Sequence, residues 1–153
     1  MRSRAFFYGL AALPLLLVFL LNAAGPAASP EVTVYKVSTC GCCAKWVEHL
    51  KKDGFQVIVH DVPDTTEISS KSGVPKSLHS CHTALVDGYT IEGHVPVADI
   101  QRLLKDRPKA KGLAVPGMPL GSPGMEGSRK DAYEVLLFDA AGKTSVFQKY
   151  AGN

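Results

Sequence analysis

The chain has 153 residues, of which 46% are hydrophobic and 20% charged, and its formal net charge is +3. Once an export signal is removed, this length fits one domain with its own core and leaves no room for a second. Lysines and arginines are scattered along the chain and form no stripe, so the charge gives no support for nucleic-acid binding.

The N-terminus has the pattern of an export signal. Arg2 and Arg4 give a short positive region, an apolar run occupies residues 5–21, and small residues follow up to Ser29. We expect residues 1–28 to be a signal peptide, whose removal lowers the net charge from +3 to +1. The alternative is an uncleaved membrane anchor, because roughly 17 apolar residues reach the lower limit for spanning a bilayer.

The mature chain begins with a β-α-β-α order. Residues 31–37 alternate and are β-branched, which predicts a strand. Apolar residues at helical spacing predict a helix over residues 44–53, with Gly54 at its C-cap. A second strand over residues 55–59 and a short polar helix over residues 65–72 follow.

A hairpin and a third helix come next. Residues 83–86 and 89–92 flank Asp87-Gly88, a dipeptide that favours the left-handed backbone of a type I′ turn. Residues 96–105 begin with proline and place their apolar side chains on one face, so they predict a helix.

The C-terminal third differs in composition. Residues 107–130 are rich in Gly, Pro and Ser without a periodic pattern, and predict a long ordered loop that carries Met118 and Met125 in a near repeat. Residues 133–138 and 144–150 predict a closing hairpin.

Four cysteines carry the chemistry of the mature chain, namely Cys40, Cys42, Cys43 and Cys81. An exported protein meets an oxidising compartment, so two structural disulfides in one of three pairings are one interpretation. A strand that runs into cysteines at the start of a helix also lowers thiol pKa values, because the helix dipole stabilises thiolates. Cys40 and Cys43 have the spacing of a redox pair, which favours a disulfide exchanger. Cys42 would disturb that exchange but suits an ion that takes several sulfurs.

Cys81-His82-Thr83 resembles the segment of thioredoxins in which a cis-proline faces the cysteine pair. His82 stands at the proline position, and the resemblance implies that a shield against metals has been exchanged for ligands. A solvated or core histidine is the alternative. Met118 and Met125 are either core fillers or soft thioether ligands. His94 is a weaker candidate, and a closed zinc site would need a different ligand spacing.

Several motifs together resemble the CopG family of bacterial metal-binding proteins, over residues 31–150. They are Val34-Tyr35-Lys36, Cys40-Gly-Cys-Cys-Ala-Lys-Trp46, Gly73-Val-Pro75, Ser80-Cys-His-Thr-Ala-Leu-Val-Asp-Gly-Tyr89, Glu92-Gly-His-Val-Pro96 and Gly112-Leu-Ala-Val-Pro-Gly-Met-Pro119. The resemblance implies an α/β, thioredoxin-like mixed sheet flanked by helices, with a core over residues 29–106 and a metal-binding extension over residues 107–153 on the same domain.

The resemblance also implies a periplasmic protein of copper resistance that binds Cu(I) or Cu(II), in a multinuclear site if thiolates bridge, and acts as a copper oxidoreductase if it interconverts them. The expected metal ligands are Cys40, Cys42, Cys43, Cys81, His82, Met118 and Met125. We expect a monomer whose partners are metal ions and other periplasmic copper-handling proteins, with no nucleic acid and no membrane after signal cleavage. A periplasmic thiol-disulfide oxidoreductase and a purely structural disulfide protein are the competing hypotheses.

Overall fold

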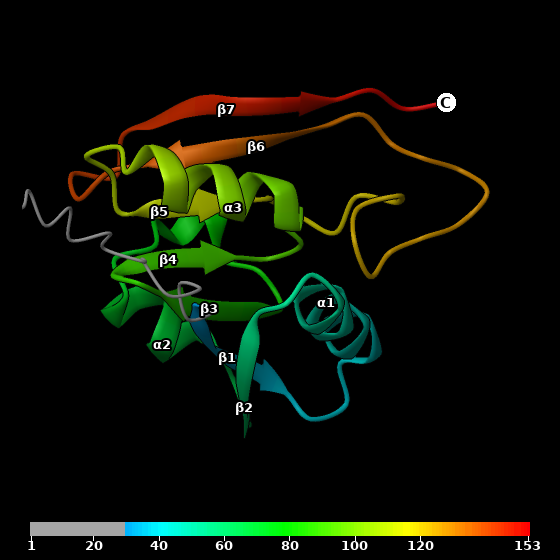
Figure 1. The fold of residues 1–153 in the computed structure, drawn as a ribbon, viewed down its shortest axis with the longest axis horizontal. Coiled ribbons are helices and arrows are strands. Elements are labelled where there is room, and N and C mark those ends of the chain that lie inside the picture. Colours follow the sequence, from blue (N-terminus) through cyan, green and yellow to red (C-terminus); the bar gives the residue numbers. More distant parts are fainter. Residues whose placement is uncertain (1–29) are drawn as a thin grey trace, which may run out of the picture.

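The computed structural model describes residues 30–153, so the predicted signal peptide lies outside the described residues. In this part of the chain, seven strands form one mixed sheet in the order β2-β1-β3-β4-β5-β6-β7, with helices packed against it (Figure 1). The elements in chain order are β1 (Glu31–Val37), α1 (Gly41–Lys52), β2 (Gln56–Val62), α2 (Thr66–Lys71), the 3-10 helix η1 (Lys76–Leu78), β3 (His82–Val86), β4 (Tyr89–Glu92), α3 (Val97–Asp106), β5 (Gly112–Ala114), β6 (Tyr133–Phe138) and β7 (Thr144–Tyr150). The predicted thioredoxin-like α/β fold is confirmed.

Strand β1 leads into the first three cysteines and lies between β2 and β3. It pairs parallel with β2 and antiparallel with β3, and Val32 and Val34 are fully buried beneath α1. The β3-β4 hairpin turns through Asp87 at φ 48° and Gly88 at φ 85°, the two left-handed residues that a type I′ turn requires. This turn fixes the register of the hairpin, and therefore which residues face each other beyond its open end.

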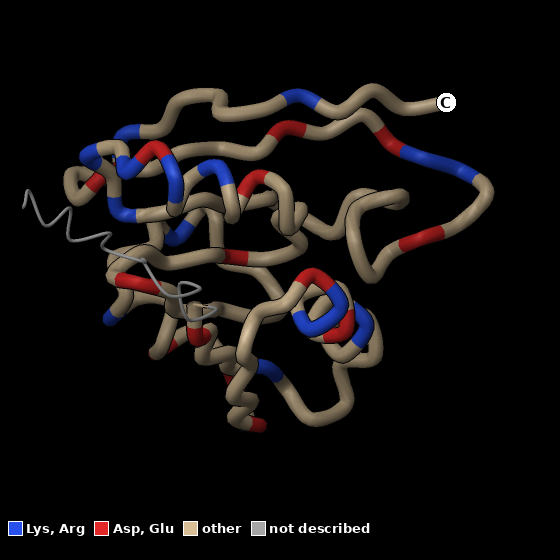
Figure 2. Tube along the Cα trace, in the orientation of Figure 1, with Lys and Arg blue, Asp and Glu red and all other residues tan. Residues whose placement is uncertain are grey.

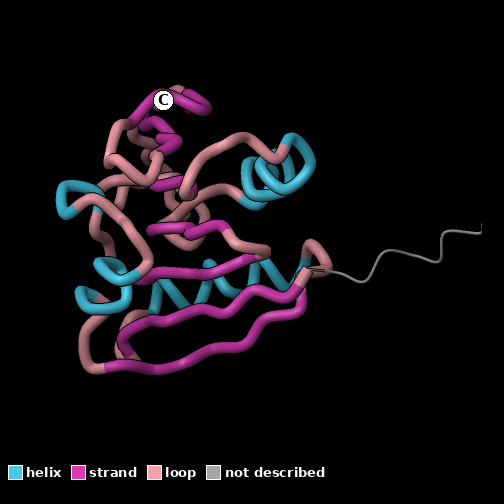
Figure 3. The backbone as a smooth tube through the Cα atoms, turned by 90° about the vertical axis from the view of Figure 1, so that its left-hand side faces the viewer, coloured by secondary structure: helices cyan, strands magenta, loops and turns pink. Residues whose placement is uncertain are grey.

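Helices cover both faces of the sheet (Figure 3). On one face, α1 and α3 enclose the main apolar core, in which Trp46, Ile91 and Leu113 are fully buried. On the other face, α2 and η1 cover a smaller cluster that includes Leu78 and Phe138. Side chains alternate along β3 and β4, so these two strands contribute to both faces.

The short strand β5 corrects the prediction of an uninterrupted loop over residues 107–130. It pairs parallel with β4 and antiparallel with β6, and so joins the closing hairpin to the sheet. Gly112 meets Thr90 so closely that an added Cβ would overlap the Thr90 carbonyl group. Three residues are too few to show an alternating pattern, which explains why the sequence did not predict this strand.

A polar cluster fastens the C-terminal hairpin to α3. Asp99, almost fully buried, accepts hydrogen bonds from the Tyr150 hydroxyl at 2.7 Å and from Arg102 at 3.2 Å. Arg102 also lies over the Phe147 ring and donates to the Phe147 carbonyl oxygen at 2.9 Å. Tyr133 stacks on Tyr150. The hairpin is therefore held by specific contacts from α3 as well as by its strand pairing.

Lysine and arginine occur on several elements with aspartate and glutamate among them (Figure 2). None of the helices within residues 30–153 combines the length and the apolar character that crossing a membrane needs.

Candidate metal centre

Helix α1 begins three residues earlier than the sequence predicts, and this places the cysteine cluster in its first turn. Cys40 is the N-cap residue, and its sulfur accepts a hydrogen bond from the Cys43 amide at 3.3 Å. A sulfur in this position takes the place of a capping oxygen. The positive end of the helix dipole stabilises negative charge there, as the sequence predicts for a thiolate.

Four sulfurs gather at this helix end. The Sγ atoms of Cys40, Cys42, Cys43 and Cys81 all lie within 4.8 Å of one another. Cys40 and Cys43 form a disulfide, whereas Cys42 and Cys81 are free thiols. The Cys42 sulfur lies 3.5 Å from the Cys40 sulfur. The structure therefore shows the oxidised state of the Cys-x-x-Cys pair, with two further thiols beside it.

Cys81 also belongs to a second group of potential ligands. Its sulfur lies 3.4 Å from His82 Nδ1 and 3.2 Å from His94 Nε2, and the three ligand atoms are within 4.8 Å of one another. Burial raises the pKa of the Cys81 thiol to about 11. Without a cation this residue is therefore a protonated thiol, and a metal ion that binds it must displace the proton.

His82 lies at the start of β3 and is fully buried beneath α1. Its ring contacts the Trp46 ring, with centroids 4.3 Å apart, and meets the His94 ring edge-on at 5.0 Å. Burial lowers the pKa of His82 to about 3, so the imidazole is neutral, as a metal ligand must be. Its Nε2 atom has no hydrogen-bond partner within residues 30–153, an unusual position for a buried polar atom.

His94, a weaker candidate in the sequence, joins the centre directly. Its Nδ1 atom lies 2.8 Å from the Pro123 carbonyl oxygen, an acceptor, so Nδ1 carries the proton and donates. Burial lowers the pKa of His94, which keeps the ring neutral. The lone pair of Nε2 therefore points to Cys81. Metal-binding histidines are commonly oriented in this way, by a hydrogen bond from the other ring nitrogen to a backbone carbonyl oxygen.

Comparisons with known proteins identify the family of this chain. A family model described as "Protein of unknown function, DUF411" matches residues 78–125, which include Cys81 and His94. Two solved structures of a copper resistance protein CopG, Form 2 and Form 1, are 46% and 47% identical to this chain, cover 80% of it and 98% of their own chains, and superpose with a TM-score of 0.76. The chain belongs to the CopG family. The comparison with curated proteins gives no match.

The donor set of this CopG family member fits a soft metal ion. Thiolate sulfurs suit soft ions such as Cu(I), and also zinc, while imidazole nitrogens suit copper and zinc alike. The two groups share Cys81, so one thiolate can contact ions in both. The buried Nε2 atom of His82 has no hydrogen-bond partner in the described residues. This is a second indication that the region accommodates a ligand. The residues therefore fit copper, and all four sulfurs become available once the Cys40–Cys43 disulfide is reduced.

The predicted methionines lie in a loop that borders this candidate centre. The loop approaches α1 so closely that a Cβ on Gly124 would overlap the Cys42 carbonyl oxygen. At its other end, the Gly117 carbonyl accepts from Ser80, the residue before Cys81. Met125 is half-buried, whereas the Met118 side chain is 53% exposed. Each methionine is thus next to a residue that contacts the centre, and its role as a ligand stays a prediction.

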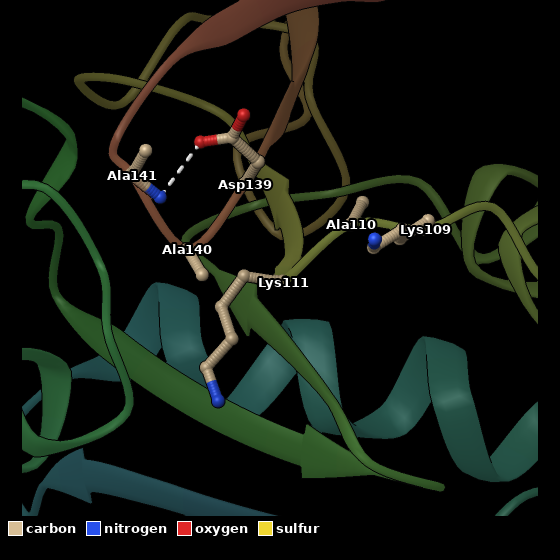
Figure 4. Close-up of a pocket in the computed structure, with 6 residues that line it drawn as sticks. All are labelled: Lys109, Ala110, Lys111, Asp139, Ala140 and Ala141. Atoms are coloured by element: carbon tan, nitrogen blue, oxygen red, sulfur yellow. Dashed lines mark hydrogen bonds between the residues drawn. The ribbon is translucent and has the colours of Figure 1, made fainter.

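Other candidate features lie outside the centre. His49 is exposed on α1, and its Nε2 atom lies 2.5 Å from Glu126 Oε1. A cavity of about 380 Å³ is lined by Lys109, Lys111 and Asp139 with three alanines (Figure 4). It lies at the amino end of β5, whereas the cysteines and histidines gather at the opposite end of the sheet. It offers neither sulfur nor imidazole, so it lacks the donors that a soft ion such as Cu(I) prefers.

Proposed function

We propose that this protein binds copper in the periplasm and contributes to copper resistance. The four sulfurs within 4.8 Å of one another, joined through Cys81 to two neutral imidazoles, carry the proposal. Copper is the protein's cargo or substrate here, held by Cys40, Cys42, Cys43 and Cys81 with His82 and His94. Export rests on the sequence pattern of residues 1–28. The name of the CopG relatives, a copper resistance protein, supports the choice of metal.

The disulfide between Cys40 and Cys43 supports a redox role within this function. When the pair is reduced, four thiol sulfurs are available and favour Cu(I). When it is oxidised, Cys42 and Cys81 remain with two imidazoles, a mixed set that accepts Cu(II) more readily. We therefore propose that the protein interconverts Cu(I) and Cu(II). Two electrons from the Cys40 and Cys43 thiols reduce two Cu(II) ions to Cu(I) as the disulfide forms, and the reverse step returns those electrons to the pair.

A periplasmic thiol-disulfide oxidoreductase is the second candidate. The disulfide at the first turn of α1, with Cys40 as the N-cap residue, favours it. Cys40 would then attack a substrate and Cys43 would resolve the mixed disulfide. The nearby thiol of Cys42 and the histidines have no part in that reaction, whereas copper binding uses all of them.

Cys42 separates the two functions. Replacing Cys42 with serine removes one sulfur of the group but leaves the Cys-x-x-Cys pair intact. We expect the reduced variant to bind Cu(I) at least about 100-fold more weakly than the wild type. Loss of a residue that only hydrogen-bonds to a metal ligand already lowers metal affinity by about 10–100-fold. Anaerobic Cu(I) titration with a competing chelator measures this. Disulfide reduction of insulin is the parallel assay, and a wild-type protein that is active there but takes up no stoichiometric copper would favour the oxidoreductase.

The two methionines need a separate test. Met118→Leu and Met125→Leu conserve volume and remove only the thioether sulfur. If the sulfurs are copper ligands, each change weakens Cu(I) binding by at least about tenfold, since loss of an outer partner of a metal ligand already costs 10–100-fold. Copper-edge X-ray absorption spectroscopy should show fewer sulfur neighbours in the variants. Unchanged affinity and an unchanged spectrum in both variants would remove the methionines from the site.

A further inference from the structure

Glu92, at the end of β4, is a carboxylate with 0% exposure that lies outside the proposed ligand set. Among the described residues it forms no salt bridge with a lysine, arginine or histidine. Burying a carboxylate without a cationic partner costs stability unless several hydrogen bonds compensate for lost water. The contacts of Glu92 therefore show what this carboxylate does in the fold.

Its two oxygens hold both sides of the Cys81-His82 dipeptide. Oε1 accepts the Ser80 amide at 2.6 Å, on the N-terminal side, and Oε2 accepts the Thr83 hydroxyl at 2.8 Å, on the C-terminal side. The Ser69 hydroxyl of α2 lies 3.3 Å from Oε1 and 2.8 Å from the Thr83 hydroxyl. The amide that Glu92 holds is thus in the residue immediately before Cys81.

The strand that carries Glu92 also positions His94. The Gly93 amide donates to the His82 carbonyl oxygen at 3.0 Å, which ties the two strands beside the centre. A Cβ on Gly93 would lie 2.7 Å from the Ser80 hydroxyl, so only glycine lets the chain pass here. The backbone between Glu92 and His94 is therefore fixed relative to Cys81.

We propose that Glu92 is a positioning residue, which holds Cys81 and His82 in the geometry that binds copper together with His94. Ser80 and Thr83 transmit its effect, and Glu92 does not touch the metal. Only the copper readout of this inference rests on the proposed function, because the position of the Cys81 thiol can be measured in the metal-free protein.

The test compares Glu92→Gln with Thr90→Val. Thr90 is a matched control, since it is also buried on β4 and donates to the Ser72 carbonyl oxygen at the C-terminal end of α2. Two properties are measured well below the unfolding temperature of each variant. The first is Cu(I) affinity, measured by chelator competition. The second is the rate at which iodoacetamide alkylates Cys81 in the metal-free mature protein, followed by peptide mass spectrometry.

We expect Glu92→Gln to lower Cu(I) affinity by about tenfold, in the range found for outer partners of metal ligands. The Cys81 alkylation rate should rise by about threefold or more, because a loosened segment opens more often. Thr90→Val should change neither property by more than about twofold, even if both variants lose similar stability. The proposal is overturned if Glu92→Gln keeps the wild-type alkylation rate. It is also overturned if Thr90→Val raises that rate as much as Glu92→Gln does.

Thr83 gives a second pair of variants if Glu92→Gln does not fold. Thr83→Val removes the hydroxyl that Oε2 accepts, and Thr83→Ser keeps it. The valine variant should raise the Cys81 alkylation rate and the serine variant should restore it, whereas equal rates in both contradict the proposal. A wild-type protein that binds no copper would refute the proposed function, and the alkylation rates would still decide the role of Glu92.

Discussion

Replacing Cys81 with serine is expected to weaken copper binding more than any other single change in the centre. Cys81 is the one residue in both groups of ligand atoms, the four sulfurs and the Cys81-His82-His94 set. Its loss therefore removes a sulfur from the first group and the only sulfur from the second. We expect Cu(I) affinity to fall below that of Cys42→Ser, and so by more than about 100-fold relative to the wild type. Anaerobic chelator competition on both reduced variants measures which of them binds Cu(I) more weakly.

Serine is close in volume to cysteine, so the fold should survive this change. Thermal unfolding of the metal-free variants provides the control, and the two should differ by less than about 1 kcal/mol because neither sulfur belongs to the main apolar core. Equal copper affinities for Cys81→Ser and Cys42→Ser would show that Cys81 does not connect the two groups. The centre would then be a sulfur site beside an unrelated pair of histidines.

Much of the fold followed from local pattern. The alternation of residues 31–37 predicted β1, and the Asp87-Gly88 dipeptide predicted the hairpin turn that the structure confirms. The sequence predicts the start of α1 three residues too late, because Gly41 and two cysteines are weak helix formers. The capping sulfur of Cys40 nevertheless extends the helix to include them. Strand β5 exists only through its two neighbours, and no local pattern could indicate it.

The role of His94 could have been inferred from the hairpin. Residues that face each other across an antiparallel pair are separated symmetrically about its turn. Counting outward from Asp87-Gly88 places Val86 opposite Tyr89 and Thr83 opposite Glu92, as observed. Two further steps bring Cys81 opposite His94. The sequence does not predict that the two histidines are buried. Their neutral state depends on that burial, which α1 and the loop that contains Pro123 provide.

The pairing of the cysteines depends on which sulfurs the fold brings together. Spacing left open whether Cys40 and Cys43 form a disulfide or bind metal as thiolates. The structure places them in a disulfide and leaves Cys42 and Cys81 free beside them. The same four sulfurs can therefore form either a metal site or a redox pair with two thiols, and copper itself can be the oxidant that drives one into the other.

Copper(II) added to the fully reduced protein under anaerobic conditions is expected to become Cu(I). Oxidation of the Cys40 and Cys43 thiolates to a disulfide releases two electrons, so one protein molecule reduces two Cu(II) ions to two Cu(I) ions. Any thiol that is still protonated loses its proton to solvent. The Cu(II) electron paramagnetic resonance signal should disappear up to two ions per protein, while titratable thiols fall from four to two.

Peptide mapping decides whether the electrons come from this pair. The new disulfide should join Cys40 to Cys43, because these two sulfurs are bonded in the structure while Cys42 and Cys81 are not. A Cys40→Ser/Cys43→Ser variant keeps two thiols and both histidines, so it should retain bound Cu(II) and its resonance signal for longer. Persistent Cu(II) with four titratable thiols in the wild type would contradict the redox role and leave a protein that only sequesters copper. The stoichiometry thus separates storage from turnover, since only a protein that must be reduced again after every two ions needs an electron donor.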